Sequence, residues 1–140
     1  MSSAGPTPGH LVWRLAMKWR TAVDRALDPL GLTHAQYVVL SSLAALDRPS
    51  QRELADHTGL EPLYVSKLAR SLEASGFISR TRDAVDTRTM RLALTPRGVE
   101  VVEPAITTVR SLMDRLLTPL GDRTDALSRD LTALLAVPLD

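Results

Sequence analysis

The sequence contains no cysteine and few aromatic residues, with two Trp, two Tyr and one Phe among 140 residues. Without cysteine the chain can form no disulfide, thiolate zinc site or iron–sulfur cluster, and it has no thiol to act as a redox switch. Aliphatic side chains must therefore fill the core. With 44% hydrophobic and 24% charged residues, the composition is that of a globular domain rather than of a disordered or collagen-like chain.

Long apolar runs are also missing. The longest uncharged stretch, between Asp28 and Asp47, contains a proline, a glycine and several polar side chains, so it cannot span a bilayer. Residues 1–9 are small and proline-rich, without a basic segment followed by an apolar one, and we interpret them as a flexible tail. We expect one domain over residues 10–140, in a cytoplasmic protein that does not contact membranes.

The residue patterns of catalysis are scarce as well. His10, His34 and His57 lie more than twenty residues apart, with no partner at the spacing of metal ligands. The sequence has no glycine-rich phosphate loop and no nucleophile motif, and its acidic residues are scattered over helix faces. We therefore predict no metal, no cofactor and no enzymatic activity.

Apolar periodicity and helix caps predict six helices and one hairpin. Helices are expected over residues 11–27, from Thr33, from Ser50 to about His57 and from Pro62 to Gly76. Two strands, 77–82 and 90–94, enclose a long polar loop without glycine. A long helix from Pro96 to Leu120, kinked at Pro104, precedes a last helix over 127–135. This order is typical of a mainly α protein with a small β-wing. It predicts a winged helix–turn–helix over about 33–97, flanked by helices over about 10–30 and 96–137.

Charge is unevenly distributed along the chain. Residues 1–63 are neutral overall and residues 99–140 carry a net charge of −3, but residues 64–98 carry +4. The basic segment includes the second helix of the predicted helix–turn–helix and the hairpin. Its basic side chains are Lys67, Arg70, Arg80, Arg82, Arg88, Arg91 and Arg97. This placement favours contact with DNA, and the alternative is an ordinary solvated surface.

Within the helix expected over 62–74, Lys67 and Arg70 lie on the face opposite the apolar Leu68 and Leu72. Such a helix can enter the major groove with the side chains near its N-terminus at the base edges. We expect Tyr64, Ser66 and Lys67 to read bases and Arg70 to contact phosphate. Arg80 and Arg82 are further candidates for DNA contact.

In the hairpin loop, Arg88 follows Asp86 by two residues. An arginine on an extended loop can enter a narrow minor groove, and a nearby carboxylate can hold its guanidinium in place. The alternative interpretation is a surface ion pair that contributes little.

These segments closely resemble the MarR family of bacterial transcriptional regulators over residues 10–136. The motifs that carry the resemblance are Ser50–Gly59, Val65–Leu68, Leu72–Arg80, Asp86-Thr-Arg88 and Leu92–Gly98. The resemblance implies a homodimer that binds pseudo-palindromic operators, usually as a repressor, and is often released by small phenolic ligands. It also implies a recognition helix over about 62–74 and a wing arginine at Arg88 oriented by Asp86. Glu61 departs from the family pattern, in which Ser or Asp often caps this helix.

The apolar residues of the flanking helices support a dimer independently of the resemblance, because a small winged domain cannot cover them all. The alternative is a monomer in which the terminal helices pack against the rest of the same chain. The resemblance also implies a pocket for a small aromatic ligand between these helices and the DNA-binding part. The candidate lining residues are His10, Trp13, Arg14, Met17, Tyr37 and Met113. The alternative is that these side chains are simply core. The alternative function is a winged-helix module for protein–protein contact, which Lys67, Arg70 and Arg88 disfavour.

Overall fold

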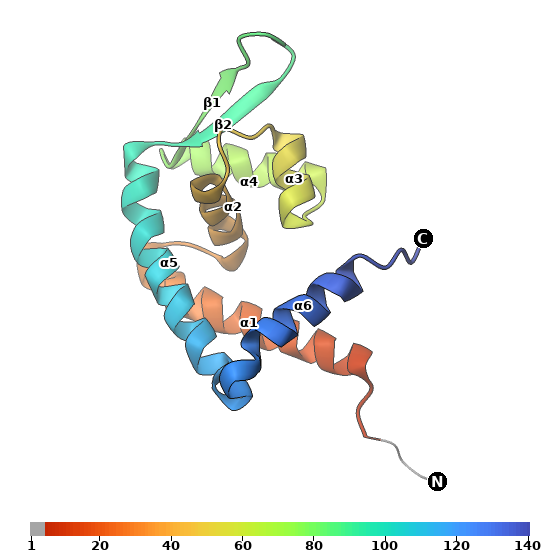
Figure 1. Ribbon diagram of the computed structural model, residues 1–140. Coiled ribbons are helices and arrows are strands. Elements are labelled where there is room, and N and C mark those ends of the chain that lie inside the picture. The colour runs from red at the N-terminus through yellow and green to blue at the C-terminus, as the bar shows by residue number, and fades with distance from the viewer. Residues whose placement is uncertain (1–4) are drawn as a thin grey trace. The chain divides into compact units, whose positions relative to one another are not determined.

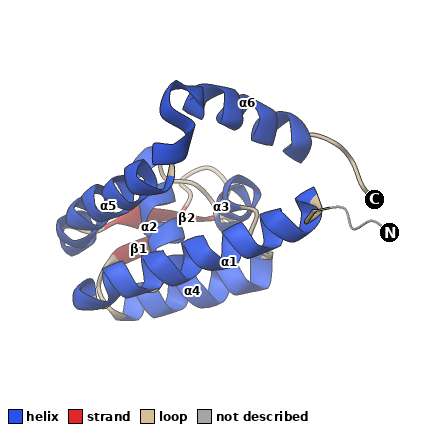
Figure 2. Ribbon diagram, turned by 90° about the horizontal axis from the view of Figure 1, so that it is seen from below, coloured by secondary structure: helices blue, strands red, loops and turns tan. Residues whose placement is uncertain are grey.

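The computed structural model describes residues 5–140 as mostly helical, with two short strands (Figure 1). It divides into two compact units, one ending at Val109 and the other covering Arg110–Asp140. The predicted class, mainly α with a small β-wing, is confirmed (Figure 2). Among the described residues, no helix is long and apolar enough to cross a membrane.

The first unit begins with α1 (Pro8–Leu27), which starts inside the predicted tail. Thr7 caps this helix, because its Oγ1 accepts a hydrogen bond from the His10 backbone N–H at 3.2 Å, and Pro8 suits the first helical position. The expected tail of residues 1–9 therefore overlaps α1 at Pro8 and Gly9. Of this tail, Met1–Ala4 lie outside the described residues. A short 3₁₀ helix, η1 (Asp28–Leu30), follows.

The next helix, α2 (His34–Ala45), starts at the predicted capping box. Thr33 Oγ1 accepts from the Gln36 backbone N–H at 3.1 Å, and Gln36 Oε1 accepts from the Thr33 backbone N–H at 2.9 Å. Val39, Leu40 and Leu43 are buried. As its nearly continuous apolar run predicts, α2 is buried on more than one side, by α1, α3, α4 and β2.

The helix–turn–helix consists of α3 (Gln51–Thr58) and α4 (Pro62–Ala74). Gly59 ends α3 in the left-handed conformation, with φ of 75°, which a residue without Cβ adopts without strain. Leu54 of α3 and Leu68 and Leu72 of α4 are buried with the apolar face of α2. Burial of this common core sets the orientation of α4.

The hairpin pairs β1 (Ile78–Arg82) with β2 (Met90–Leu94), with Ile78 opposite Leu94. We call residues 78–94 the wing. A bridge between Ser50 and Arg91, and a hydrogen bond from the Leu92 N–H to the Pro49 oxygen at 2.9 Å, join the wing to the segment before α3. The wing is therefore attached to the helix–turn–helix by backbone pairing as well as by chain connectivity.

The chain then enters α5 (Pro96–Leu116), which continues through Pro104 into the second unit. The predicted end at Leu120 is wrong, because Leu120 lies in the 3₁₀ helix η2 (Thr118–Arg123). Pro119 explains the earlier end, since proline has no N–H with which to continue the hydrogen bonds of the α-helix. The second unit closes with α6 (Thr124–Leu135).

Candidate nucleic-acid interface

The helix α4 has one buried face and one polar exposed face. Val65, Leu68, Ala69 and Leu72 are buried, whereas Lys67 and Arg70 are exposed on the opposite side. At the N-terminus, Tyr64 is exposed and Ser66 is partly buried. The three candidate base readers and Arg70, the candidate phosphate contact, therefore all lie on the predicted helix, and all but Ser66 are exposed.

Glu61 caps this helix despite its departure from the family pattern. Its Oε2 accepts a hydrogen bond from the Tyr64 backbone N–H at 3.3 Å. The carboxylate is thus turned back onto the first turn of α4, where the partial positive charge of the helix end favours it.

In the wing, Arg88 is a highly exposed cation, with 90% of its side chain accessible. Asp86 Oδ1 accepts hydrogen bonds from both the Arg88 backbone N–H at 3.1 Å and the Arg88 Nε at 3.3 Å. Asp86 Oδ2 accepts from the Thr89 hydroxyl at 3.2 Å. One carboxylate therefore orients the arginine and also stabilises the loop that carries it.

The carboxylates of the loop stay charged at neutral pH. Hydrogen bonds from the Arg88 backbone and side chain lower the pKa of Asp86. The pKa of Asp83 is lowered chiefly by the hydrogen bond that its Oδ2 accepts from the Asp86 backbone N–H at 3.0 Å. The loop geometry is consequently insensitive to pH in the neutral range, since both groups titrate below their ordinary acidic values.

Arg91 has a structural role that the sequence did not reveal. Its Nη1 lies 2.6 Å from Glu53 Oε1 of α3, and its Nε lies 3.6 Å from Asp83 Oδ1 at the base of the loop. These pairs raise the pKa of Arg91, chiefly through the hydrogen bond to Glu53. The same hydrogen bond is the main cause of the lowered pKa of Glu53. Arg91 therefore connects the wing with α3, although Glu53 is 38 residues away in sequence.

Two other predicted DNA contacts, Arg80 and Arg82, have partners within the protein. Arg80 Nε pairs with Glu73 Oε1 of α4 at 3.1 Å, and Arg82 Nη1 donates to the Thr87 backbone oxygen at 2.8 Å. Arg80 is partly buried, whereas Arg82 is exposed. Arg80 thus joins β1 to α4, and Arg82 joins β1 to the wing loop, so neither guanidinium group is without a partner in the protein.

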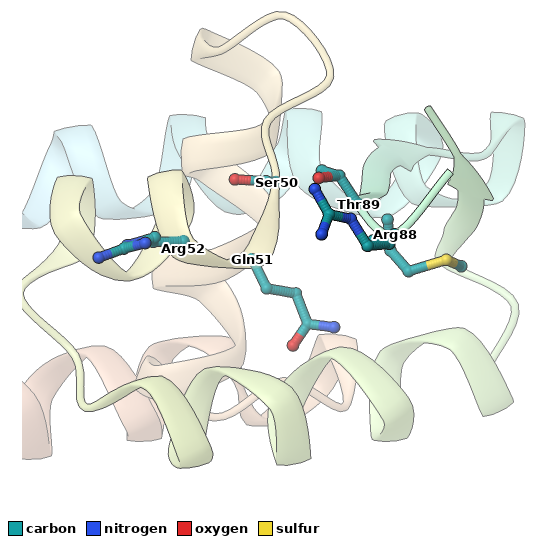
Figure 3. A pocket seen from close by; sticks show the side chains of 6 residues that line it. Ser50, Gln51, Arg52, Arg88 and Thr89 are labelled. Atoms are coloured by element: carbon teal, nitrogen blue, oxygen red, sulfur yellow. The ribbon is translucent and has the colours of Figure 1, made fainter. Parts of the chain in front are cut away.

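A hollow of about 330 Å³ lies between the start of α3 and the wing loop (Figure 3). Its lining residues are Ser50, Gln51, Arg52, Arg88, Thr89 and Met90. Figure 3 shows Gln51 and Arg52 pointing to different sides of α3. Gln51 and Arg52 were missed at the sequence level, because the segment before residue 64 has no net charge and only the fold brings Arg52 near Arg88.

The candidate ligand residues are not gathered in one place by the described contacts. His10, Trp13, Arg14 and Met17 follow one another on one exposed face of α1, and Arg14 borders a shallow hollow with Leu11, Leu15 and Lys18. Tyr37 is partly buried on α2, and Met113 belongs to the second unit. Across residues 5–140, no group of three or more His, Asp or Glu side chains could hold a metal ion.

The comparisons with known proteins all find transcriptional regulators. The MarR family model matches residues 32–90. The chain is 34% identical to the uncharacterized HTH-type transcriptional regulator YdcH of Bacillus subtilis strain 168 over 115 residues, covering 79% of this chain and 78% of that protein. It is 33% identical to the HTH-type transcriptional repressor Rv2887 of Mycobacterium tuberculosis strain H37Rv over 112 residues, covering 80% and 81%.

Solved structures agree with these relatives. The transcriptional repressor CouR, bound to a 23-mer DNA duplex, superposes with a TM-score of 0.84 at 30% identity, covering 92% of each chain. CouR from Rhodococcus jostii RHA1 bound to p-coumaroyl-CoA has a TM-score of 0.86 at 29% identity, covering 99% of each chain. The similarity thus extends over the flanking helices as well as the winged helix–turn–helix.

Proposed function

The chain belongs to the MarR family of transcriptional regulators, and we propose that it is a homodimeric repressor that binds a pseudo-palindromic operator in the cytoplasm. The observation that carries the proposal is the combination of an exposed polar face on α4 with an exposed Arg88 held by Asp86. CouR, of the same fold, is a repressor bound to DNA, which supports the same type of partner here.

In this proposal, α4 enters the major groove. Tyr64, Ser66 and Lys67 face base edges near the N-terminal end of the helix, and Arg70 neutralises phosphate. Arg88 enters the adjacent minor groove, where a narrow A·T-rich segment has a strong negative potential. Arg82 and Arg52 add positive charge beside these contacts, whereas Arg80 acts mainly by holding β1 against α4.

The homodimer is supported by apolar side chains that each unit leaves exposed. Leu11, Val12 and Leu15 of α1 are exposed, and Leu134 and Leu135 of α6 are exposed by 65% and 87%. A twofold interface between two copies would cover such surfaces and place two α4 helices about 34 Å apart, one turn of DNA.

Selection of bound duplexes from a random pool, followed by affinity measurements at several salt concentrations, tests DNA recognition. We expect one palindromic sequence to be enriched and its affinity to fall steeply with salt, as phosphate neutralisation requires. Arg88→Ala should weaken binding about tenfold, most strongly with A·T-rich flanks. Arg25→Ala, which removes an exposed cation from α1, should leave binding nearly unchanged. Weak binding without sequence preference would instead favour the protein–protein module.

We further propose that a small aromatic compound releases the repressor from DNA. The structure of CouR with p-coumaroyl-CoA supports a ligand of this chemistry. The candidate contacts are His10, Trp13, Arg14 and Met17 on α1, with Tyr37 and Met113 as further lining residues. Arg14 can pair with a carboxylate, while Trp13 and Met17 offer apolar contact.

Titration of aromatic carboxylates and their coenzyme A thioesters into the protein–DNA complex tests this second proposal. We expect one compound to lower DNA affinity at least about tenfold, the usual range of coupling between two sites. Arg14→Ala should abolish this response while DNA binding without the compound stays intact. If the compound bound the Arg14→Ala and Trp13→Ala variants as well as it binds the unaltered protein, the ligand site would not lie at these residues.

A further inference from the structure

The most exposed apolar side chain of the helix–turn–helix is Leu63, with an exposed fraction of 77%. It is the second residue of α4, and it lies outside the buried face formed by Val65, Leu68, Ala69 and Leu72. A single exposed leucine is ordinary on a protein surface. Its position at the leading end of the helix that we place in the major groove is what requires an explanation.

The surroundings of Leu63 are polar and basic. Ser66, Lys67 and Arg70 follow it at spacings of three, four and seven residues, so they share its side of the helix. The apolar centre of a protein–protein contact is depleted of charge, unlike this surface. A positively charged surface that carries an exposed leucine matches the major groove of DNA, which is lined by phosphates and offers one apolar group, the 5-methyl of thymine.

We propose that Leu63 recognises a thymine through its 5-methyl group, once in each half-site of the operator. This inference rests on the proposed function and identifies one base that the protein selects. Because the contact is apolar, it contributes to sequence preference and leaves the salt dependence of binding unchanged, in contrast to Lys67 and Arg70.

Replacement of single thymines in the selected operator by 2′-deoxyuridine tests this contact, since the exchange removes the methyl group and keeps base pairing. We expect one position per half-site at which the exchange weakens binding about fourfold, and about fifteenfold when both half-sites are changed, as roughly one buried methyl group each predicts. In Leu63→Ala the same exchange should have no effect.

Val85→Ala is the matched control, because it shortens another highly exposed apolar side chain, on the wing loop. This variant should keep the full effect of the exchange. The inference would be overturned if the unaltered protein bound its operator selectively but no thymine-to-deoxyuridine exchange weakened binding. It would also be overturned if the exchange weakened binding by Leu63→Ala as much as binding by the unaltered protein. Either result would leave the proposed function intact. Loss of the dimer in Leu63→Ala, measured by light scattering, would assign the side chain to a protein contact and also overturn it. Absence of selective binding by the unaltered protein would overturn both proposals.

Discussion

Asp86 lies two residues before Arg88 and determines how that arginine is presented. It accepts three hydrogen bonds, from the Arg88 backbone, the Arg88 guanidinium and the Thr89 hydroxyl. Its charge, in contrast, opposes DNA, because a carboxylate near phosphates is repelled. The two effects have opposite signs, so substitution of Asp86 separates geometry from charge.

We expect Asp86→Ala to weaken DNA binding about tenfold, although the variant is more positively charged, because the loop and Arg88 lose their common acceptor. Asp86→Asn keeps one oxygen acceptor and should retain part of the affinity. Fluorescence anisotropy with the selected operator measures both variants. Tighter binding by Asp86→Ala would show that charge outweighs geometry at this position.

Among the elements, two contacts add to the backbone pairing with Pro49 and Ser50 and to the Arg80–Glu73 pair in holding the wing in place. The Arg91 guanidinium connects β2 with Glu53 of α3, and the turn before α5 packs closely against the end of α4. Neither contact was evident in the sequence, because each joins residues that are far apart along the chain. The elements themselves were predictable, since capping boxes, prolines and apolar spacing act locally.

The Arg91–Glu53 pair predicts coupling between α3 and the wing. Both Arg91→Gln and Glu53→Gln should lower operator affinity about threefold, and the double variant should lose little more, because the residues act through the same contact. A double-mutant cycle on operator binding measures this coupling. If Glu53→Gln instead tightens binding, removal of a negative charge matters more than the position of the wing.

Gly98 of α5 lies directly against the backbone of Phe77, in the segment between α4 and β1. A Cβ at this position would collide with the Phe77 backbone oxygen, which already accepts a hydrogen bond from the Thr95 N–H at 3.0 Å. We expect Gly98→Ala to lower the free energy of unfolding by about 2 kcal/mol, measured by urea denaturation. Gly9→Ala in α1 has open space around it and should cost nothing. Equal stability of the two variants would contradict the tight packing.

The exposed apolar side chains of α1 and α6 support the proposed homodimer. Each unit leaves its own set uncovered, with Trp13 exposed by 62% on α1 and Leu134 by 65% on α6. A repressor with two reading helices also gains affinity from binding both half-sites together.

We expect Leu134→Asp to convert the dimer into a monomer at micromolar concentration and to weaken operator binding by about 100-fold or more, because the two half-sites are no longer bound together. Arg129→Gln changes the net charge by the same amount at an exposed position of α6 away from Leu131, Leu134 and Leu135, and should remain dimeric. Size-exclusion chromatography with light scattering measures the mass, and circular dichroism checks that the helices are retained. A dimeric Leu134→Asp would place the interface elsewhere.

The helices, the hairpin and the basic segment over residues 64–98 could be predicted from the amino-acid sequence, because caps, turn residues and charge are properties of neighbours along the chain. Which arginines are available to a partner depends on the packing of the folded chain. Arg88 is exposed, whereas Arg80 pairs with Glu73 and Arg91 pairs with Glu53. These pairings depend on how α3, α4 and the wing pack around one core. The distribution of charge along the sequence does not show which of these residues come together.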